Sequence, residues 1–178
     1  MASGSEKTVV AVPESRLRPE ACAFFGSPDP GNGKSLLRGS VEVRLLPFIP
    51  QPAYDRLLWA SDWNFVRGED SFVRAQWAQR PLAWQIYPQK ENAHRLKLDA
   101  FLDLYCAGMD RTVSETLRQL WRAWNSAGEG GPDIGELWGA IRGHKTVLRT
   151  QSAAWTAKLA AVGNLAGNLA QYCEERLK

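Results

Sequence analysis

"WNFVRGEDSFVRAQWAQRPLAWQIYPQ", residues 63–89, contains two short apolar runs on either side of a charged segment. Residues 63–67 and 81–87 have the length and apolar content of buried strands, and residues 70–79 between them have the spacing of a helix. A strand, a helix and a second strand in this order are typical of a βαβ unit, whose two strands lie parallel in one sheet. The stretch therefore predicts an α/β fold.

Strands and helices also alternate on both sides of this stretch. We expect further strands at residues 8–12 and 41–49, and helices at residues 14–25, 51–60 and 94–105. Such alternation predicts a Rossmann-like parallel sheet with helices on both faces.

The last third of the chain has a helical pattern instead. Residues 112–126 and 145–177 are expected to be helices, separated by the Gly-rich segment 126–135, and a second Gly- and Pro-rich segment, residues 26–35, reads as a loop. The fold is therefore expected to end in a helical tail. An apolar stripe near helical spacing is expected to be packing surface: Leu159, Val162, Leu165, Leu169 and Tyr172.

Composition narrows the class of protein. With 178 residues, of which 44% are apolar and 23% charged, the chain is expected to form one globular domain with its own core. The net charge of +3 comes from 22 basic and 19 acidic residues without a basic run, so we expect no nucleic-acid partner. Eight tryptophans include Trp59, Trp63, Trp77 and Trp84, which are expected to pack.

The cysteines and histidines limit which disulfides, metal sites and cellular locations the sequence suggests. Cys22, Cys106 and Cys173 are an odd number and far apart, so the sequence indicates neither a disulfide framework nor a zinc site. We expect a reducing, cytoplasmic location, no membrane span and no metal. His94 is expected to face solvent or the loop after "IYPQ". Residues 1–7 are expected to be a flexible lead-in or a remnant of cloning.

The charges of the opening stretch lie where a parallel sheet binds ligands, beyond the carboxyl ends of its strands. Arg67 ends a predicted strand, and Asp70 or Ser71 is expected to cap the helix that follows. A helix N-terminus suits a phosphate, and Arg67 would add a charged fork to the same anion. Glu69 and Asp70 suit sugar hydroxyls better than phosphate, so the combination points to a nucleotide sugar.

A structural interpretation of these residues stays open. Asp or Ser at a helix N-cap is ordinary stabilisation, and an Arg beside acidic residues is often an ion pair. Upstream, Phe48 and Tyr54 on a Pro-stiffened segment could sandwich a base while Gln51 bonds to a sugar or base edge. Equally, Phe48 could belong to the core and Tyr54 to a helix surface.

Residues 45–105, including "LPFIPQPAYDRLLWASDWNFVRGEDSFVRAQWAQRPLAWQIYPQ", closely resemble the C-terminal half of the bacterial protein-arginine rhamnosyltransferases that modify elongation factor P, and "LRQLWRAWN" continues the resemblance. The resemblance implies a glycosyltransferase of the GT-B fold, with two Rossmann-like domains facing a cleft. Such an enzyme transfers rhamnose, with inversion, from dTDP-β-L-rhamnose to an arginine of this translation factor. Residues 8–178 would be its C-terminal donor domain, without the N-terminal acceptor domain.

The resemblance also implies roles for single residues. Phe48 and Tyr54 would stack on thymine, while Gln51 and Asp70 would hold the deoxyribose or thymine. Arg67 and Ser71 would bind the diphosphate, and Tyr87 would reach the pyrophosphate or the bound sugar.

Catalysis and metal use follow from the same resemblance. Arg67 and Glu69 are the expected catalytic residues, with Glu69 orienting substrate or Arg67. Family members often have "FVWHIYPQ" where this chain has "LAWQIYPQ", so Gln85 stands at the place of a histidine. The family implies no metal, because Arg and helix dipoles neutralise the leaving diphosphate.

In the family that the sequence resembles, the proposed aspartate base and most of the acceptor surface belong to the N-terminal half, which this chain lacks. A guanidinium is protonated near neutral pH, so its attack needs a carboxylate to orient it and take a proton. Neither Glu69 nor Asp70 is an evident substitute, so the chain is expected to bind nucleotide sugar without turning it over. The alternative is a non-catalytic nucleotide-binding or protein-interaction module.

Overall fold

The computed structural model describes residues 6–15, 17–126 and 132–176. The chain divides between Arg56 and Leu57 into two compact units, which are described separately below. Of the expected lead-in, residues 1–5 lie outside the described residues.

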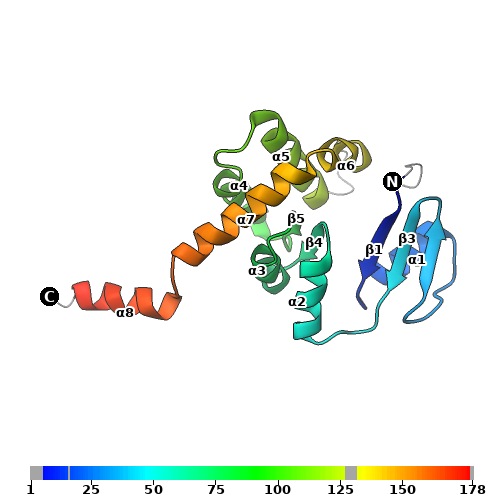
Figure 1. Ribbon diagram of the computed structural model, residues 1–178, viewed down its shortest axis with the longest axis horizontal. Helices are drawn as coiled ribbons and strands as arrows, with labels where there is room; N and C mark the ends of the chain where they lie inside the picture. The colour runs from blue at the N-terminus through cyan, green and yellow to red at the C-terminus, as the bar shows by residue number, and fades with distance from the viewer. Residues whose placement is uncertain (1–5, 16, 127–131, 177–178) are drawn as a thin grey trace. The chain divides into compact units, whose positions relative to one another are not determined.

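The first unit is a small three-stranded sheet with one helix. Its elements are β1 (Thr8–Val12), α1 (Leu17–Phe25), β2 (Ser35–Arg38) and β3 (Val41–Leu45). The strand order is β1-β3-β2, and β1 runs parallel to β3, as Figure 1 shows. A core of Cys22, Leu36, Val41, Val43 and Leu45 lies between the sheet and α1.

The antiparallel strand β2 was not expected from the sequence, because it has only four residues and begins where the Gly- and Pro-rich segment 26–35 ends. β2 forms a hairpin with β3 through the two residues Gly39 and Ser40, and Gly39 has φ 58°. Two-residue hairpin turns need positive φ, which glycine adopts at no steric cost. β3 also ends at Leu45, four residues earlier than expected, because Pro47 and Pro50 cannot donate to a ladder.

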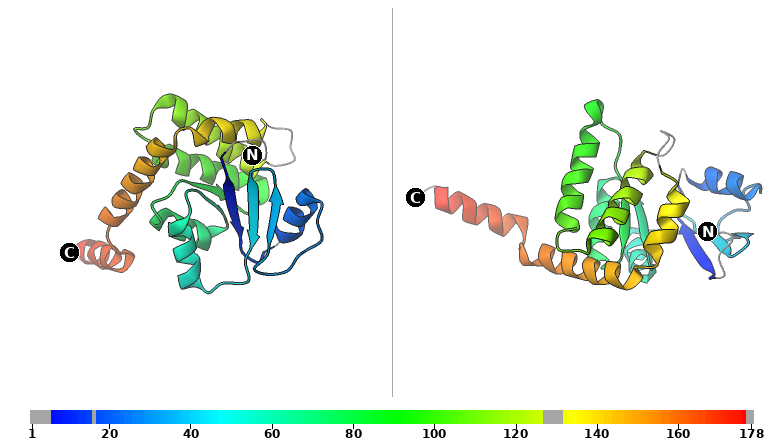
Figure 2. Two further views of the ribbon diagram at one scale, coloured as in Figure 1. Left: turned by 45° about the vertical axis from the view of Figure 1, so that its right-hand side comes forward. Right: turned by 90° about the horizontal axis from the view of Figure 1, so that it is seen from above.

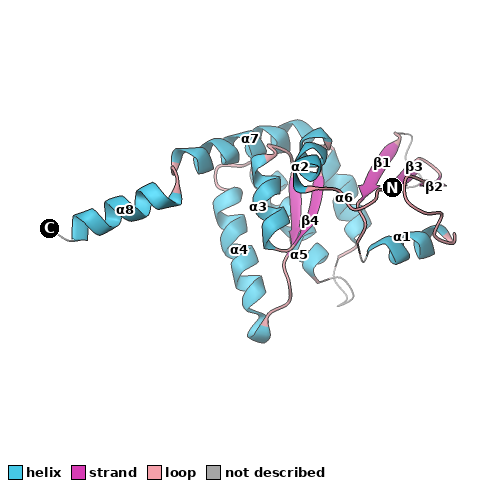
Figure 3. Ribbon diagram, turned by 90° about the horizontal axis from the view of Figure 1, so that it is seen from below, coloured by secondary structure: helices cyan, strands magenta, loops and turns pink. Residues whose placement is uncertain are grey.

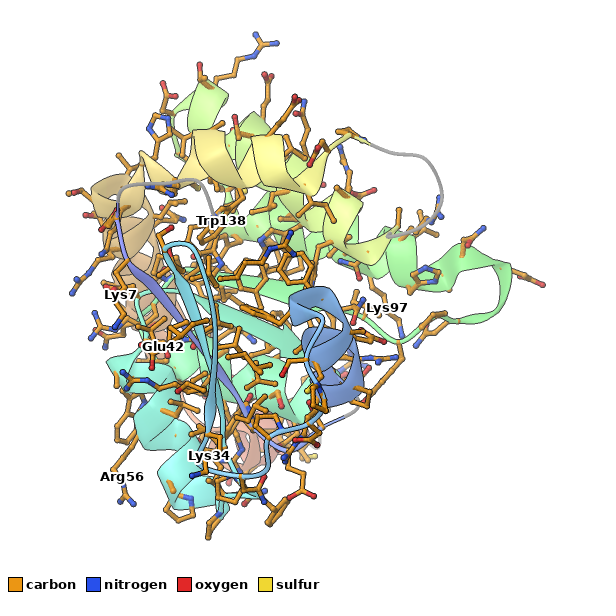
Figure 4. All side chains as sticks on the ribbon, turned by 90° about the vertical axis from the view of Figure 1, so that its right-hand side faces the viewer. Lys7, Lys34, Glu42, Arg56, Lys97 and Trp138 are labelled. Atoms are coloured by element: carbon orange, nitrogen blue, oxygen red, sulfur yellow. The ribbon has the colours of Figure 1, made fainter. Side chains whose placement is uncertain are left out.

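Glu42 on β3 is the centre of a charged network. Its carboxylate accepts from Lys7 Nζ at 2.8 Å, Arg44 Nε at 2.7 Å and Ser35 Oγ at 3.2 Å. Lys7 and Glu42 are labelled in Figure 4. The hydrogen bonds from Arg44 and Lys7 lower the pKa of Glu42 to about 2.

The second unit contains the βαβ unit that the opening stretch predicts. β4 (Asn64–Arg67), α3 (Glu69–Trp77) and β5 (Leu82–Gln85) follow in order, and the two strands pair in parallel with Asn64 opposite Leu82. This prediction is confirmed. The unit opens with α2 (Gln51–Ala60), a helix that crosses the division between the two units.

Among the described residues, five further helices follow the two strands. They are α4 (Ala93–Tyr105), α5 (Arg111–Asn125), α6 (Ile134–Arg142), α7 (Lys145–Ala161) and α8 (Leu165–Arg176), with a short 3₁₀ turn η1 (Lys90–Asn92) before α4. Figure 3 shows α3 and α4 on one side of the strands and α6 on the other, while α5 packs against β5. Helices on both faces were expected, and this part of the fold prediction is confirmed.

Aromatic side chains fill both faces of the strand pair. On one face Trp84 of β5 stacks on Phe72 of α3, with ring centroids 3.8 Å apart. Phe101 of α4 makes an edge contact with this pair and also stacks on Trp121 of α5. On the other face, Phe65 of β4 contacts Trp124 of α5 and Trp138 of α6.

Two of the tryptophans expected to pack are half-exposed instead. Trp59 and Trp77 are 51% and 49% exposed, whereas Trp84 is buried and Trp63 packs against Phe65 and Trp138. Trp59 lies in α2 and Trp77 ends α3, where each helix presents its outer face.

The C-terminal helical region differs from the single helix expected at residues 145–177. α7 ends at Ala161 and α8 begins at Leu165, because Gly163 with φ 80° breaks the helix. α7 is anchored in the core, where Trp155 Nε1 donates to Gln76 Oε1 at 2.9 Å. α8 extends from the end of α7 (Figure 2), and residues 161–176 are exposed within the described part of the chain.

The apolar stripe is exposed where it lies on α8, at Leu165, Leu169 and Tyr172, so this part of it is not buried by other described residues. α6 is a further helix that the sequence analysis missed, because its two glycines weaken the helical pattern. The Gly-rich loop before it, at residues 127–131, lies outside the described residues.

Asn125 at the end of α5 completes the outer edge of β5. Its Oδ1 accepts from the N–H of Ile86, and its Nδ2 donates to the carbonyls of Trp84 and Trp121, each at 2.8 Å. In a strand, the backbone groups of successive residues point alternately to opposite edges. The side-chain amide of Asn125 therefore bonds to backbone groups that a neighbouring strand would otherwise pair with. It holds the chain directly before Tyr87.

We expect Asn125→Ala to lower the free energy of unfolding of the second unit by about 2–3 kcal/mol, because two buried backbone groups lose their partners. All eight tryptophans follow residue 57, so tryptophan fluorescence in urea reports this unit. Gln171→Ala on exposed α8 is the control and should stay within about 0.5 kcal/mol. Equal effects of the two variants would contradict the role of Asn125.

Glu42 predicts acid sensitivity of the first unit. Its folded pKa of about 2 lies below the usual value of 4.5, so its stabilising contribution is complete above about pH 4.5 and is lost as the pH falls toward about 2. Urea unfolding followed through the amide NMR signals of β3 should show this loss. In Glu42→Gln the pH dependence should be shallower over this window, and an unchanged slope would contradict the prediction.

Candidate functional site

Arg67 and Tyr87 come together at the carboxyl edge of the parallel strands. Arg67 is the last residue of β4, and Tyr87 lies two residues beyond the end of β5. The guanidinium carbon of Arg67 lies 5.1 Å from the centroid of the Tyr87 ring, a cation–π contact. Both side chains are exposed, so their outer surfaces can meet a ligand.

The first turn of α3 lies directly beside this pair. Glu69 is its first residue, and Asp70 and Ser71 follow. The N-cap is Gly68, so the expectation that Asp70 or Ser71 caps the helix is wrong. Because glycine has no side chain to accept from the first turn, the N–H groups of residues 69–71 stay available to an anion.

Two other helices of this unit, α5 and α6, begin with a side-chain cap. Asp110 caps α5 by accepting from the N–H of Val113 at 3.1 Å, and Asp133 caps α6 by accepting from Gly135 at 2.6 Å. The N-cap of α4, Asn92, makes no capping bond with its side chain and has φ 57°. The two helices that follow β4 and β5 thus both begin without a side-chain cap.

The ion pair in this region involves Arg74, not Arg67. Arg74 Nε lies 3.0 Å from Asp70 Oδ2, one turn along α3. Within the described residues Arg67 forms no ion pair, and Glu69 is exposed. The structural interpretation therefore applies to Asp70, whereas Arg67 forms no ion pair with a carboxylate of the described residues.

The loop after Tyr87 is tied to α4 by His94. The buried imidazole accepts at Nδ1 from the N–H of Gln89 at 3.2 Å. Of the two expected places for His94, the loop after "IYPQ" is confirmed. An accepting Nδ1 means that the proton of the neutral ring is on Nε2.

The expected base-binding residues belong to the first unit. Phe48 follows β3 and is 80% exposed, so the reading of Phe48 as core is wrong. Gln51 begins α2 and is exposed, and Tyr54 lies one turn later and is half-buried. The remaining expected residues belong to the second unit: Arg67, Glu69, Asp70, Ser71 and Tyr87.

Two residues that shape the surroundings of Arg67 were not predicted from the sequence. Gly68 forms the junction of β4 and α3, and a glycine between a strand end and a helix start is a signal that could have revealed it. Asn125 holds the chain before Tyr87 by bonding to Ile86 from 39 residues away in sequence, for which the sequence offers no local signal.

The described residues offer neither a metal-ligand cluster nor a membrane-spanning helix. Among them, no three or more His, Cys, Asp or Glu side chains gather as a metal site would require. None of the helices placed there has both the length and the apolar composition needed to cross a membrane.

The family described as the elongation factor P rhamnosyltransferase EarP matches residues 1–174 of this chain. The chain belongs to the EarP family. It is 40% identical over 167 residues to the protein-arginine rhamnosyltransferase of Pseudomonas aeruginosa, covering 94% of this chain and 43% of that protein. It is 40% identical over 177 residues to the Pseudomonas putida protein of the same name, covering 99% and 46%.

A solved EarP structure supports the fold assignment. That structure concerns EarP-mediated arginine glycosylation of translation elongation factor EF-P, and it matches 98% of this chain and 54% of its own with a TM-score of 0.84 and 37% identity. The α/β fold of GT-B type is therefore confirmed. The chain spans about half the length of the EarP relatives that it matches.

Proposed function

We propose that this chain is the donor-binding half of an inverting glycosyltransferase that moves rhamnose from dTDP-β-L-rhamnose to an arginine of elongation factor P. Membership of the EarP family supports the reaction. The observation that carries the donor role is the Arg67 guanidinium, unpaired with any described carboxylate, beside the uncapped N-terminus of α3.

Charge on the leaving group explains this choice of residues. As the bond from rhamnose to the diphosphate breaks, negative charge grows on the phosphate oxygens. Arg67 offers a planar fork of donors, and the first turn of α3 offers N–H groups and a partial positive charge. The hydroxyls of Ser71 and Tyr87 add further donors, so residues of this chain can stabilise the diphosphate without a metal.

The base and sugar contacts rest on the family resemblance. Phe48 and Tyr54 stack on thymine, while Gln51 and Asp70 hold the deoxyribose or thymine. The high exposure of Phe48 supports this role, because an aromatic ring with little cover in its own unit has a free face for a base.

In the proposed reaction, Arg67 stabilises the leaving diphosphate, and Glu69 orients the substrate or Arg67. The base that takes a proton from the acceptor arginine comes from the other half of the enzyme. Elongation factor P is a cytoplasmic translation factor, so the proposed location is the bacterial cytoplasm.

Calorimetric titration with dTDP-β-L-rhamnose, dTDP and UDP tests the donor role. We expect the thymidine ligands to bind, and Arg67→Ala to weaken them by about 10- to 100-fold, because a charge-assisted hydrogen bond contributes about 1.5–3 kcal/mol. Arg111→Ala is the matched control, since Arg111 also loses a charge but pairs on the surface with Glu115. Failure of all three ligands to bind a folded chain would contradict the proposal.

Arginine transfer is the second test. The chain, mixed with elongation factor P and dTDP-β-L-rhamnose, should leave the acceptor arginine unmodified by mass spectrometry, whereas the Pseudomonas putida rhamnosyltransferase serves as the positive control. A rhamnosylated arginine in the first reaction would show that this half carries its own base.

A further inference from the structure

Gly68 joins the end of β4 to the start of α3 in a conformation that other residues avoid. Its φ is 75° and its ψ 178°, a region that is essentially restricted to glycine. The backbone on both sides is fixed by β5. The N–H of Gly68 donates to the carbonyl of Gln85 at 3.1 Å, and its carbonyl accepts from Trp84 Nε1 at 3.0 Å.

Tyr87 occupies the space that a side chain at position 68 would need. A Cβ placed on Gly68 would lie 2.8 Å from Cε2, 3.0 Å from Oη and 3.1 Å from Cζ of Tyr87. These distances are shorter than van der Waals contact, so the hydroxyl end of the ring sits against the glycine. The same ring lies beneath the Arg67 guanidinium.

We propose that Gly68 is a positioning residue for donor binding, which sets the phenol of Tyr87 and, through it, the guanidinium of Arg67. This inference rests on the proposed donor role of those two side chains. By lacking a side chain, Gly68 lets the Tyr87 hydroxyl lie beside the first turn of α3, where the diphosphate is proposed to bind. Gly68 acts through Tyr87 and needs no ligand contact of its own.

Two glycine-to-alanine variants distinguish a positioning role of Gly68 from a purely structural one. Because Tyr87 is 48% exposed, its ring can swing outward when a methyl group appears at position 68. Gly68→Ala is therefore expected to fold with Tyr87 displaced. Gly108 is the matched control, since it has a similar φ of 82° but no atom within 4 Å of its Cβ position. Gly108→Ala introduces a side chain at a positive φ without displacing a ring.

The test combines a fluorine signal with dTDP titration. The chain contains four tyrosines, so 3-fluorotyrosine gives a short ¹⁹F spectrum in which Tyr87→Phe identifies the Tyr87 signal. In the ligand-free chain, Gly68→Ala should shift that signal and Gly108→Ala should not. Calorimetry should show dTDP affinity about tenfold lower in Gly68→Ala and unchanged in Gly108→Ala.

A double-mutant cycle separates positioning from strain. In a Tyr87→Ala background, adding Gly68→Ala should cost no further dTDP affinity, because the ring that it displaces is already gone. An equal loss in both backgrounds, or an unmoved Tyr87 signal, would overturn the inference while leaving the donor role intact. If the unmodified chain binds no dTDP, the proposed donor role fails and this inference with it.

Discussion

The indole of Trp84 lies flat against the ring of Phe72, with an angle of 4° between the planes, and its N–H donates to the carbonyl of Gly68. One side chain of β5 thus holds α3 by stacking and the strand-to-helix junction by a hydrogen bond. An aromatic pair of this kind adds about 0.5–1.5 kcal/mol beyond its burial. The larger consequence is geometric, because Arg67 and the first turn of α3 lie on either side of the residue that Trp84 fixes.

The edge of β5 that faces away from β4 is also held by specific hydrogen bonds. Asn125 bonds to the backbone of Trp84 and Ile86, so the strand is paired with β4 on one side and with a side-chain amide on the other. Tyr87 follows directly, and His94 anchors the loop beyond it. The exposed tyrosine therefore projects from a backbone that is fixed before and after it, which suits its proposed role of meeting a ligand at a set distance from Arg67.

The parts of the fold that were predictable are those with a local signal. The β4-α3-β5 unit follows from two apolar runs around a helical pattern, and Arg67 and Tyr87 fall at its carboxyl edge by topology alone. The N-cap was not predictable in the same way. Statistics favour Asp70 or Ser71 as a cap, whereas Gly68 takes this place because Gln85 and Trp84 hold its backbone from a distance in sequence. The break between α7 and α8 likewise depends on one positive φ at Gly163, inside a sequence whose apolar spacing continues through it.

The density of charge between β4 and α3 also has a physical reason. Arg67 and Arg74 carry two positive charges, and Glu69 and Asp70 carry two negative ones, so the group is formally neutral. Attraction for an anion then depends on where each charge points. Asp70 is drawn along the helix by Arg74, away from the N-terminal N–H groups, while Arg67 stays at the strand end over Tyr87. A neutral group with separated charges binds a bare phosphate weakly, but it can match a ligand that presents an anion and hydroxyls side by side. A nucleotide sugar has this arrangement.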